Sequence, residues 1–128
     1  MLDQEQIDEF DRNRFLNGGA VLSEEETREL SDALGAILAK GPDGFSEDEP
    51  QPVSFRSLSA SDEHPVWQIV NIWEASPAFE KLIYHPMVVK GISQLTSHRD
   101  LMVWHDQIQY KPAQYGGSTQ WHQDAPLW

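Results

Sequence analysis

The sequence predicts an α+β fold in which helices come first and strands come last. The first two thirds of the chain carry capped segments with apolar residues at helical spacing, whereas the last third alternates apolar and polar residues as a strand does. No repeat or low-complexity tract interrupts the chain. We therefore expect a single domain over residues 1–128, mainly helical over 1–98, with its first core strands in 99–128.

The first two helices are predicted by their N-terminal caps. Asp3 can cap the first, with Gln6 three residues further on, and Ser23 can cap the second, with Glu26 in the same relation. Apolar residues keep helical spacing after both caps. The second helix is expected to end at Gly41, since glycine and a following proline terminate helices.

The middle of the chain is less regular. Residues 41–52 are rich in proline, glycine and acidic side chains, which favours a plain solvated loop over a lid. Residues 53–58 suggest a short strand, whereas the apolar run 66–73 cannot be assigned by periodicity.

Two further short helices are predicted where a cap residue precedes a proline, at Ser76-Pro77 and at His85-Pro86. His64 also precedes a proline, so we interpret both histidines as turn or cap residues and not as metal ligands.

The last third of the chain predicts strands. Residues 101–111 alternate, 112–118 form a glycine-containing loop and 119–124 can form a second strand. The alternation divides this segment into two faces. One face carries Met102, Trp104, Asp106, Ile108 and Tyr110. The other carries Leu101, Val103, His105, Gln107, Gln109 and Lys111, and the sequence leaves open whether this more polar face points into the protein or to solvent.

Composition excludes several classes of function. A chain with 39% hydrophobic residues and no stretch long enough for a membrane span is expected to be cytoplasmic, without a membrane partner. The net charge of −12 disfavours nucleic acid as a partner and favours a small molecule. The absence of cysteine means that any metal must be held by His, Asp or Glu.

A candidate metal motif lies near the end of the sequence, where His122 and Asp124 are two residues apart. On a strand such residues point the same way, so an imidazole nitrogen and a carboxylate oxygen could chelate one ion. These are two of the three ligands of the two-His-one-carboxylate iron(II) site.

The context of this motif resembles the phytanoyl-CoA dioxygenase family. The resemblance rests on the strand ending in residues 106–112, the glycine-rich loop, the run Trp121-His122-Gln123-Asp124 and Trp128, and it extends over most of the chain. It implies a double-stranded β-helix (a cupin-like jelly roll) and an iron(II)- and 2-oxoglutarate-dependent dioxygenase that oxidises a small molecule by hydroxylation or halogenation. It also implies roles for individual residues: His122 and Asp124 bind iron(II), Gln109 and Gln107 contact 2-oxoglutarate, and His105 and Trp128 contact substrate.

The resemblance is incomplete, because the family's second metal-binding histidine and its cosubstrate-binding arginine have no counterpart here. A jelly roll needs about eight strands, so we expect these residues to be the N-terminal part of an oxygenase domain that lacks its C-terminal half and is inactive alone. Two alternatives remain open: a non-catalytic binding or interaction module derived from the same fold, and a subunit completed by a second polypeptide.

Overall fold

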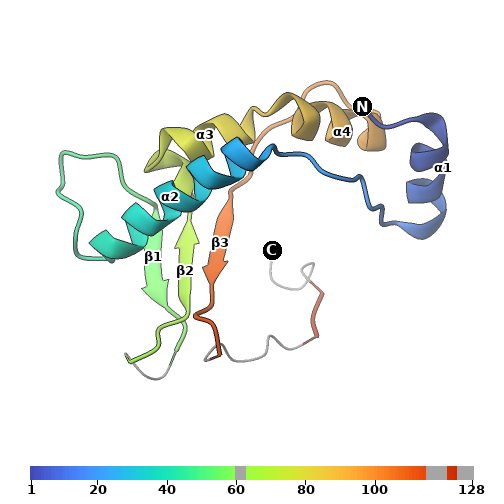
Figure 1. Ribbon diagram of the computed structural model, residues 1–128. Helices are drawn as coiled ribbons and strands as arrows, with labels where there is room; N and C mark the ends of the chain where they lie inside the picture. The colour runs from blue at the N-terminus through green and yellow to red at the C-terminus, as the bar shows by residue number, and fades with distance from the viewer. Residues whose placement is uncertain (60–62, 115–120, 124–128) are drawn as a thin grey trace.

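The computed structural model describes residues 1–59, 63–114 and 121–123, which form helices packed beside a small sheet (Figure 1). In chain order the elements are α1 (Gln4–Asn13), α2 (Glu24–Lys40), β1 (Ser54–Ser57), β2 (Trp67–Val70), the 3-10 helix η1 (Ile72–Glu74), α3 (Pro77–Ile83), α4 (Pro86–Thr96) and β3 (Gln107–Tyr110). Within those ranges, no helix has the length and apolar character that crossing a membrane requires.

The predicted caps of the first two helices are confirmed. The backbone N–H of Gln6 donates to the Asp3 carboxylate over 2.9 Å, and the backbone N–H of Ser23 donates to the Glu26 carboxylate over 2.8 Å. Both are capping boxes, which satisfy backbone donors that have no partner inside the helix. Helix α2 ends as predicted at Gly41, whose φ of 68° lies in the left-handed region that glycine adopts readily.

The two proline-initiated helices are also confirmed. Helices α3 and α4 begin at Pro77 and Pro86, where the absent N–H costs nothing and the proline φ suits a helix. His85 caps α4, since its side chain accepts a hydrogen bond from the backbone N–H of Met87.

The three strands form one antiparallel sheet in the order β1-β2-β3. The register aligns Phe55 of β1 with Ile69 of β2 and Ile108 of β3, so these three side chains share one face. The ambiguous run 66–73 is therefore a central strand followed by a 3-10 turn. The strands β1 and β2 therefore lie before the last third of the chain, where the sequence predicted the first core strands.

The strand predicted over 101–111 is wrong in its extent, because β3 covers only Gln107–Tyr110. Its neighbour β2 ends at Val70, and Asn71 adopts a left-handed conformation with φ 54° that turns the chain into η1. Beyond the last β2–β3 pair, Val70 with Gln107, the backbone N–H of Asn71 donates to the Asp106 carbonyl over 3.0 Å. Residues 101–106 lie alongside no strand among the described residues, so they have no ladder to join.

The second strand predicted at the end of the chain is not observed where it can be checked. Residues 121–123 have no regular secondary structure, and the remainder of that prediction lies outside the described residues. The described part is thus an α+β arrangement with a three-stranded sheet, which is compatible with part of a jelly roll without showing one.

The core lies between one face of the sheet and the helices α2 and α3 (Figure 1). Ile69 and Ile72 are fully buried, and Ile37 of α2 and Phe79 of α3 close over them. Helix α1 contacts α4 instead and lies away from the sheet. No helix in the described ranges covers the opposite face of the sheet, which is called the open face below.

Candidate functional site

The open face of the sheet carries a row of hydrogen-bonded polar side chains, one from each strand. Arg56 Nε donates to Gln68 Oε1 over 2.7 Å, and Gln68 Nε2 donates to Gln107 Oε1 over 2.9 Å. Arg56 and Gln68 are direct cross-strand partners, whereas Gln107 is a diagonal neighbour of Gln68. This row, Arg56-Gln68-Gln107, is called the polar row below.

The polar row borders a pocket of about 430 Å³. The size falls within the range of small-molecule sites. Two residues predicted for ligand contact, His105 and Gln107, line it together with Trp104 and Asn71. Gln109, which is paired with Gln68 in the register, is exposed on the same face but does not line the pocket. The structure thus brings His105 and Gln107 to one site, and the roles assigned to them stay predictions.

Asp106 holds the segment that carries these residues against the core. The backbone carbonyl of Asp106 accepts from the backbone N–H of Asn71 over 3.0 Å, just before η1. Burial raises the pKa of the Asp106 carboxyl, while the nearby backbone N–H groups of Ile72 and Trp73 act in the opposite direction. This contact with the chain at η1 positions the neighbours His105 and Gln107 at the pocket. Alternation had placed Asp106 on the face of Ile108, but its place beside η1 depends on a helix that the sequence did not reveal.

Two members of the polar row, Arg56 and Gln68, were not predicted as site residues. A signal was present in the sequence, since Arg56 follows the core residue Phe55 and Gln68 lies between the apolar residues Trp67 and Ile69. Each is thus a polar residue on the solvent side of a strand. Only the register shows that they lie beside Gln107.

The predicted metal ligands are only partly described. His122 is exposed, and Asp124 and the predicted substrate contact Trp128 lie outside the described residues. No group of three or more His, Asp or Glu side chains that could hold an ion is found within the described ranges. An imidazole and a carboxylate two residues apart nevertheless suit iron(II) chemically. The donor types fit the metal, and the assignment of His122 and Asp124 as its ligands stays a prediction.

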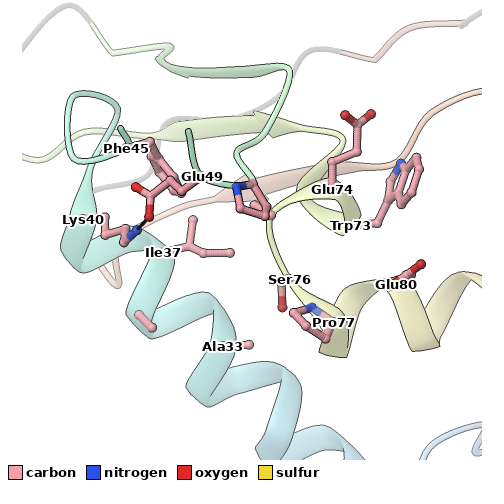
Figure 2. A pocket seen from close by; sticks show the side chains of 13 residues that line it. Ala33, Ile37, Lys40, Phe45, Glu49, Trp73, Glu74, Ser76, Pro77 and Glu80 are labelled. Carbon is pink, nitrogen blue, oxygen red and sulfur yellow. Dashed lines mark hydrogen bonds and ion pairs between the residues drawn. The ribbon is translucent and has the colours of Figure 1, made fainter. Parts of the chain in front are cut away.

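A second concavity, of about 450 Å³, lies on the helical side of the sheet (Figure 2). Its wall includes an ion pair of 2.7 Å between Lys40 and Glu49, and the Lys40 ammonium lies 4.6 Å from the centre of the Phe45 ring. None of the predicted site residues lines it. It is explained by packing of the 41–50 loop beside α2 and needs no ligand.

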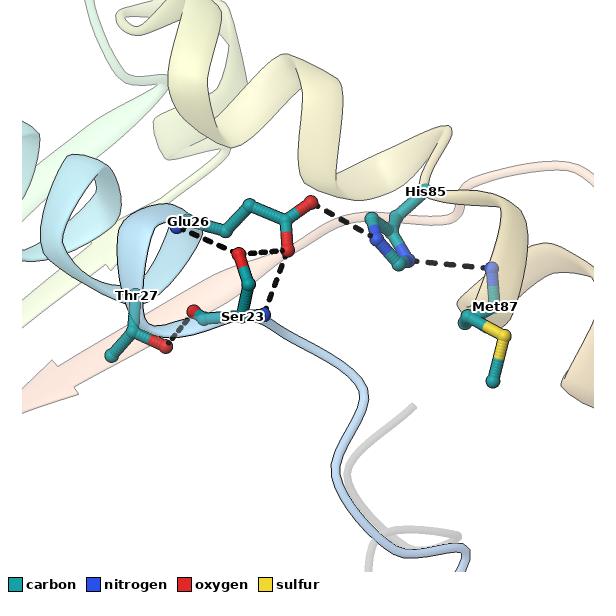
Figure 3. A network of polar contacts seen from close by, with 5 residues as sticks. All are labelled: Ser23, Glu26, Thr27, His85 and Met87. Carbon is teal, nitrogen blue, oxygen red and sulfur yellow. Dashed lines mark hydrogen bonds and ion pairs between the residues drawn. The ribbon is translucent and has the colours of Figure 1, made fainter.

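A polar network joins the starts of α2 and α4 (Figure 3). Glu26, which accepts from both Ser23 groups, also approaches His85 Nε2 at 3.3 Å. The hydrogen bond from the backbone of Ser23, followed by that from its side chain, lowers the pKa of Glu26. His85 is thereby occupied on both ring nitrogens, since Nδ1 accepts from Met87. This network explains His85 as a structural residue, in agreement with the interpretation from sequence.

Comparison with known proteins agrees with the resemblance seen in the sequence. A family model described as phytanoyl-CoA dioxygenase (PhyH) matches residues 10–128, which is most of the chain. Neither the curated proteins nor the solved structures contain a significant match. The chain belongs to the phytanoyl-CoA dioxygenase family.

Proposed function

From this membership we propose that the protein is an iron(II)- and 2-oxoglutarate-dependent dioxygenase that oxidises a small molecule by a hydroxylase-type reaction. One observation carries the proposal: the family match over residues 10–128 includes β3 and the run His122-Gln123-Asp124. The family is generally dependent on iron(II) and 2-oxoglutarate.

His122 and Asp124 would hold the metal, through an imidazole nitrogen and a carboxylate oxygen. Bound iron(II) would supply the activation of dioxygen that is coupled to oxidative decarboxylation of 2-oxoglutarate. A third protein donor is proposed to complete the site.

The open face of the sheet is proposed to bind the reactants. Gln107 and Gln109 present side-chain amides on this face, and amides can donate to carboxylate oxygens of 2-oxoglutarate. His105 is proposed to contact the substrate, because it lines the same pocket as Gln107. Trp128 is proposed as a second substrate contact. The wall of packed strands and helices behind this face would keep water from reaching the reactants from that side.

A small molecule is the proposed partner. The chain has 21 acidic residues against nine lysines and arginines, and a field of that sign repels nucleic acid phosphates. A pocket of about 430 Å³ is of a size that suits a small ligand.

The test is anaerobic titration of the full-length protein with iron(II) in the presence of 2-oxoglutarate. The variants His122→Ala and Asp124→Ala should lose the charge-transfer absorption of the ternary complex, because each removes one of few metal ligands. The matched control is His98→Ala, since His98 is an exposed histidine outside the motif. Wild-type absorption in both ligand variants would refute the metal assignment.

Absence of the absorption in the wild-type protein, together with specific binding of a small molecule, would favour the non-catalytic binding module instead. Circular dichroism of each variant should match the wild type, since the exposed His122 contributes little to packing.

A further inference from the structure

We propose that the pocket beside the polar row binds a substrate that carries a single carboxylate on an apolar body, and that Arg56 is the residue that pairs with this carboxylate. The inference rests on the proposed function and deepens it, because it names the class of substrate for the same site.

The hydrogen bonding of the polar row leaves an excess of donors facing the pocket. Arginine can only donate, so the contact at 2.7 Å requires Gln68 to present its oxygen to Arg56. The amide nitrogen of Gln68 must then point to Gln107, whose oxygen accepts at 2.9 Å. The orientation of both amides thus follows from Arg56 and does not depend on how an amide is assigned.

Donors remain available at the Arg56 end of this row. The two terminal nitrogens of the Arg56 guanidinium make no contact in the row, while the amide nitrogen of Gln107 at the other end is the donor proposed above for 2-oxoglutarate. The natural partner of the guanidinium is a group that only accepts, which is a property of a carboxylate. Two terminal guanidinium N–H groups match the two oxygens of a carboxylate in a bidentate pair.

The charge of Arg56 is not neutralised within the described part of the chain. Some basic side chains there have acidic partners, since Lys40 pairs with Glu49 and Lys81 pairs with Glu29, each at 2.7 Å, whereas others, such as Arg28, have none among the described residues. No ion pair of Arg56 is found among the described residues, although acidic residues outnumber basic ones by 21 to nine. An arginine that is exposed at a pocket, in so acidic a chain, is complementary to an anionic ligand.

The walls of the pocket favour an apolar body on that ligand. Val53 and Trp104 line the pocket with exposed fractions of 66% and 82%, and Val70 adds a third apolar side chain. Covering such surfaces removes apolar area from water and therefore favours binding. A dianion such as 2-oxoglutarate would leave these walls uncovered and would meet only one cation in a strongly acidic protein. A monocarboxylate with an aromatic or aliphatic body satisfies both features.

The experiment measures binding of 4-phenylbutyrate to the full-length protein without iron, by isothermal titration calorimetry and by NMR of the glutamine side-chain amides. Arg56→Gln should weaken binding about tenfold to a hundredfold, as expected for loss of charge-assisted hydrogen bonds. Arg56→Lys should recover part of it, since lysine keeps the charge without the bidentate geometry. The control Arg28→Gln, an exposed arginine on α2 outside the pocket, should bind as the wild type does.

Two probes of related structure complete the design. The uncharged amide 4-phenylbutanamide should bind at least tenfold more weakly than the carboxylate, and 2-oxoglutarate should not compete with it through Arg56. Equal binding by wild type and Arg56→Gln, equal binding of amide and carboxylate, or Arg56-dependent binding of 2-oxoglutarate in preference to the probe would each overturn the proposal. The last outcome would assign Arg56 to the cosubstrate.

The two proposals fail separately, because this assay contains no iron. If the probe binds through Arg56 but the protein with iron(II) and 2-oxoglutarate shows no charge-transfer absorption, the oxygenase proposal is refuted and the carboxylate site stands. Absorption that depends on His122, without probe binding, would refute the carboxylate site and leave the oxygenase.

Discussion

Replacing Asp106 tests how the segment before β3 is held against the core. Asp106→Ala removes a half-buried carboxyl that lies beside the backbone N–H groups of Ile72 and Trp73. Leaving a buried polar group without its neighbouring partner costs about 1–3 kcal/mol, and the site is only half-buried, so water replaces part of the loss. We expect a loss of about 2 kcal/mol in the free energy of unfolding. Asp106→Asn keeps a carbonyl acceptor and should lose about 1 kcal/mol.

Urea denaturation followed by tryptophan fluorescence measures this difference. With a slope of about 2 kcal/mol per molar urea, typical of small proteins, the midpoint of Asp106→Ala should fall by roughly 1 M. Asp106→Asn should lie between that variant and the wild type. An alanine variant as stable as the asparagine variant would refute a stabilising role of the Asp106 side chain beside η1.

The pH dependence gives an independent check on Asp106. Burial raises its pKa in the folded state above the ordinary value of 3.8. Protons therefore bind the folded state more tightly, so the stability contributed by this group is fully present below pH 3.8 and is lost as the pH rises through the folded pKa. The stability of the wild type relative to Asp106→Asn should fall as the pH rises through that window. Other carboxyl groups titrate in both proteins and cancel in the comparison, so an unchanged difference would refute the raised pKa.

Two further predictions concern the core and the start of α2. Ile69→Ala should lower the free energy of unfolding by about 2–5 kcal/mol, because Ile69 is fully buried in the central strand and its neighbours cannot fill the cavity without moving. A smaller loss in urea denaturation would contradict the position of Ile69 in the core. Ser23→Ala should cost about 1 kcal/mol through loss of the N-cap. The hydrogen bonds of Ser23 lower the pKa of Glu26. The stability that ionised Glu26 contributes is therefore present above its ordinary pKa of 4.5 and is lost as the pH falls through the lowered pKa. Ser23→Ala should lose less stability than the wild type over this pH range, as measured by denaturation.

The helices could be predicted from sequence because their signals are local. The partners in the capping box at Ser23 are three residues apart, and Pro77 and Pro86 mark helix starts through the fixed geometry of their own rings. These interactions form within one turn of the chain. They do not depend on what the rest of the molecule does.

The strands could be predicted only in part, because a strand exists where a partner is available. The alternation of residues 101–111 continues for several residues before Gln107, yet β3 begins there because β2 ends at Val70 and the chain turns at Asn71. Conversely, the uniformly apolar run 66–73 showed no period, and its central position between β1 and β3 explains why. Pairing over long sequence separations decides both cases.

The candidate site divides in the same way. The sequence alone predicts His122 and Asp124 as a chelating pair by spacing and family resemblance, and it places His105, Gln107 and Gln109 on one face by their two-residue period. Period and spacing are properties of a single segment, so one sequence suffices to read them.

Only the tertiary structure showed that Arg56 and Gln68 lie beside Gln107, and that the polar row borders a pocket on the open side of the sheet. Gln107 lies 39 residues from Gln68 along the chain, and their contact depends on the register of β2 with β3. That register is determined by packing Phe55, Ile69 and Ile108 against α2 and α3, because a slip of one residue would turn the apolar set away from the core.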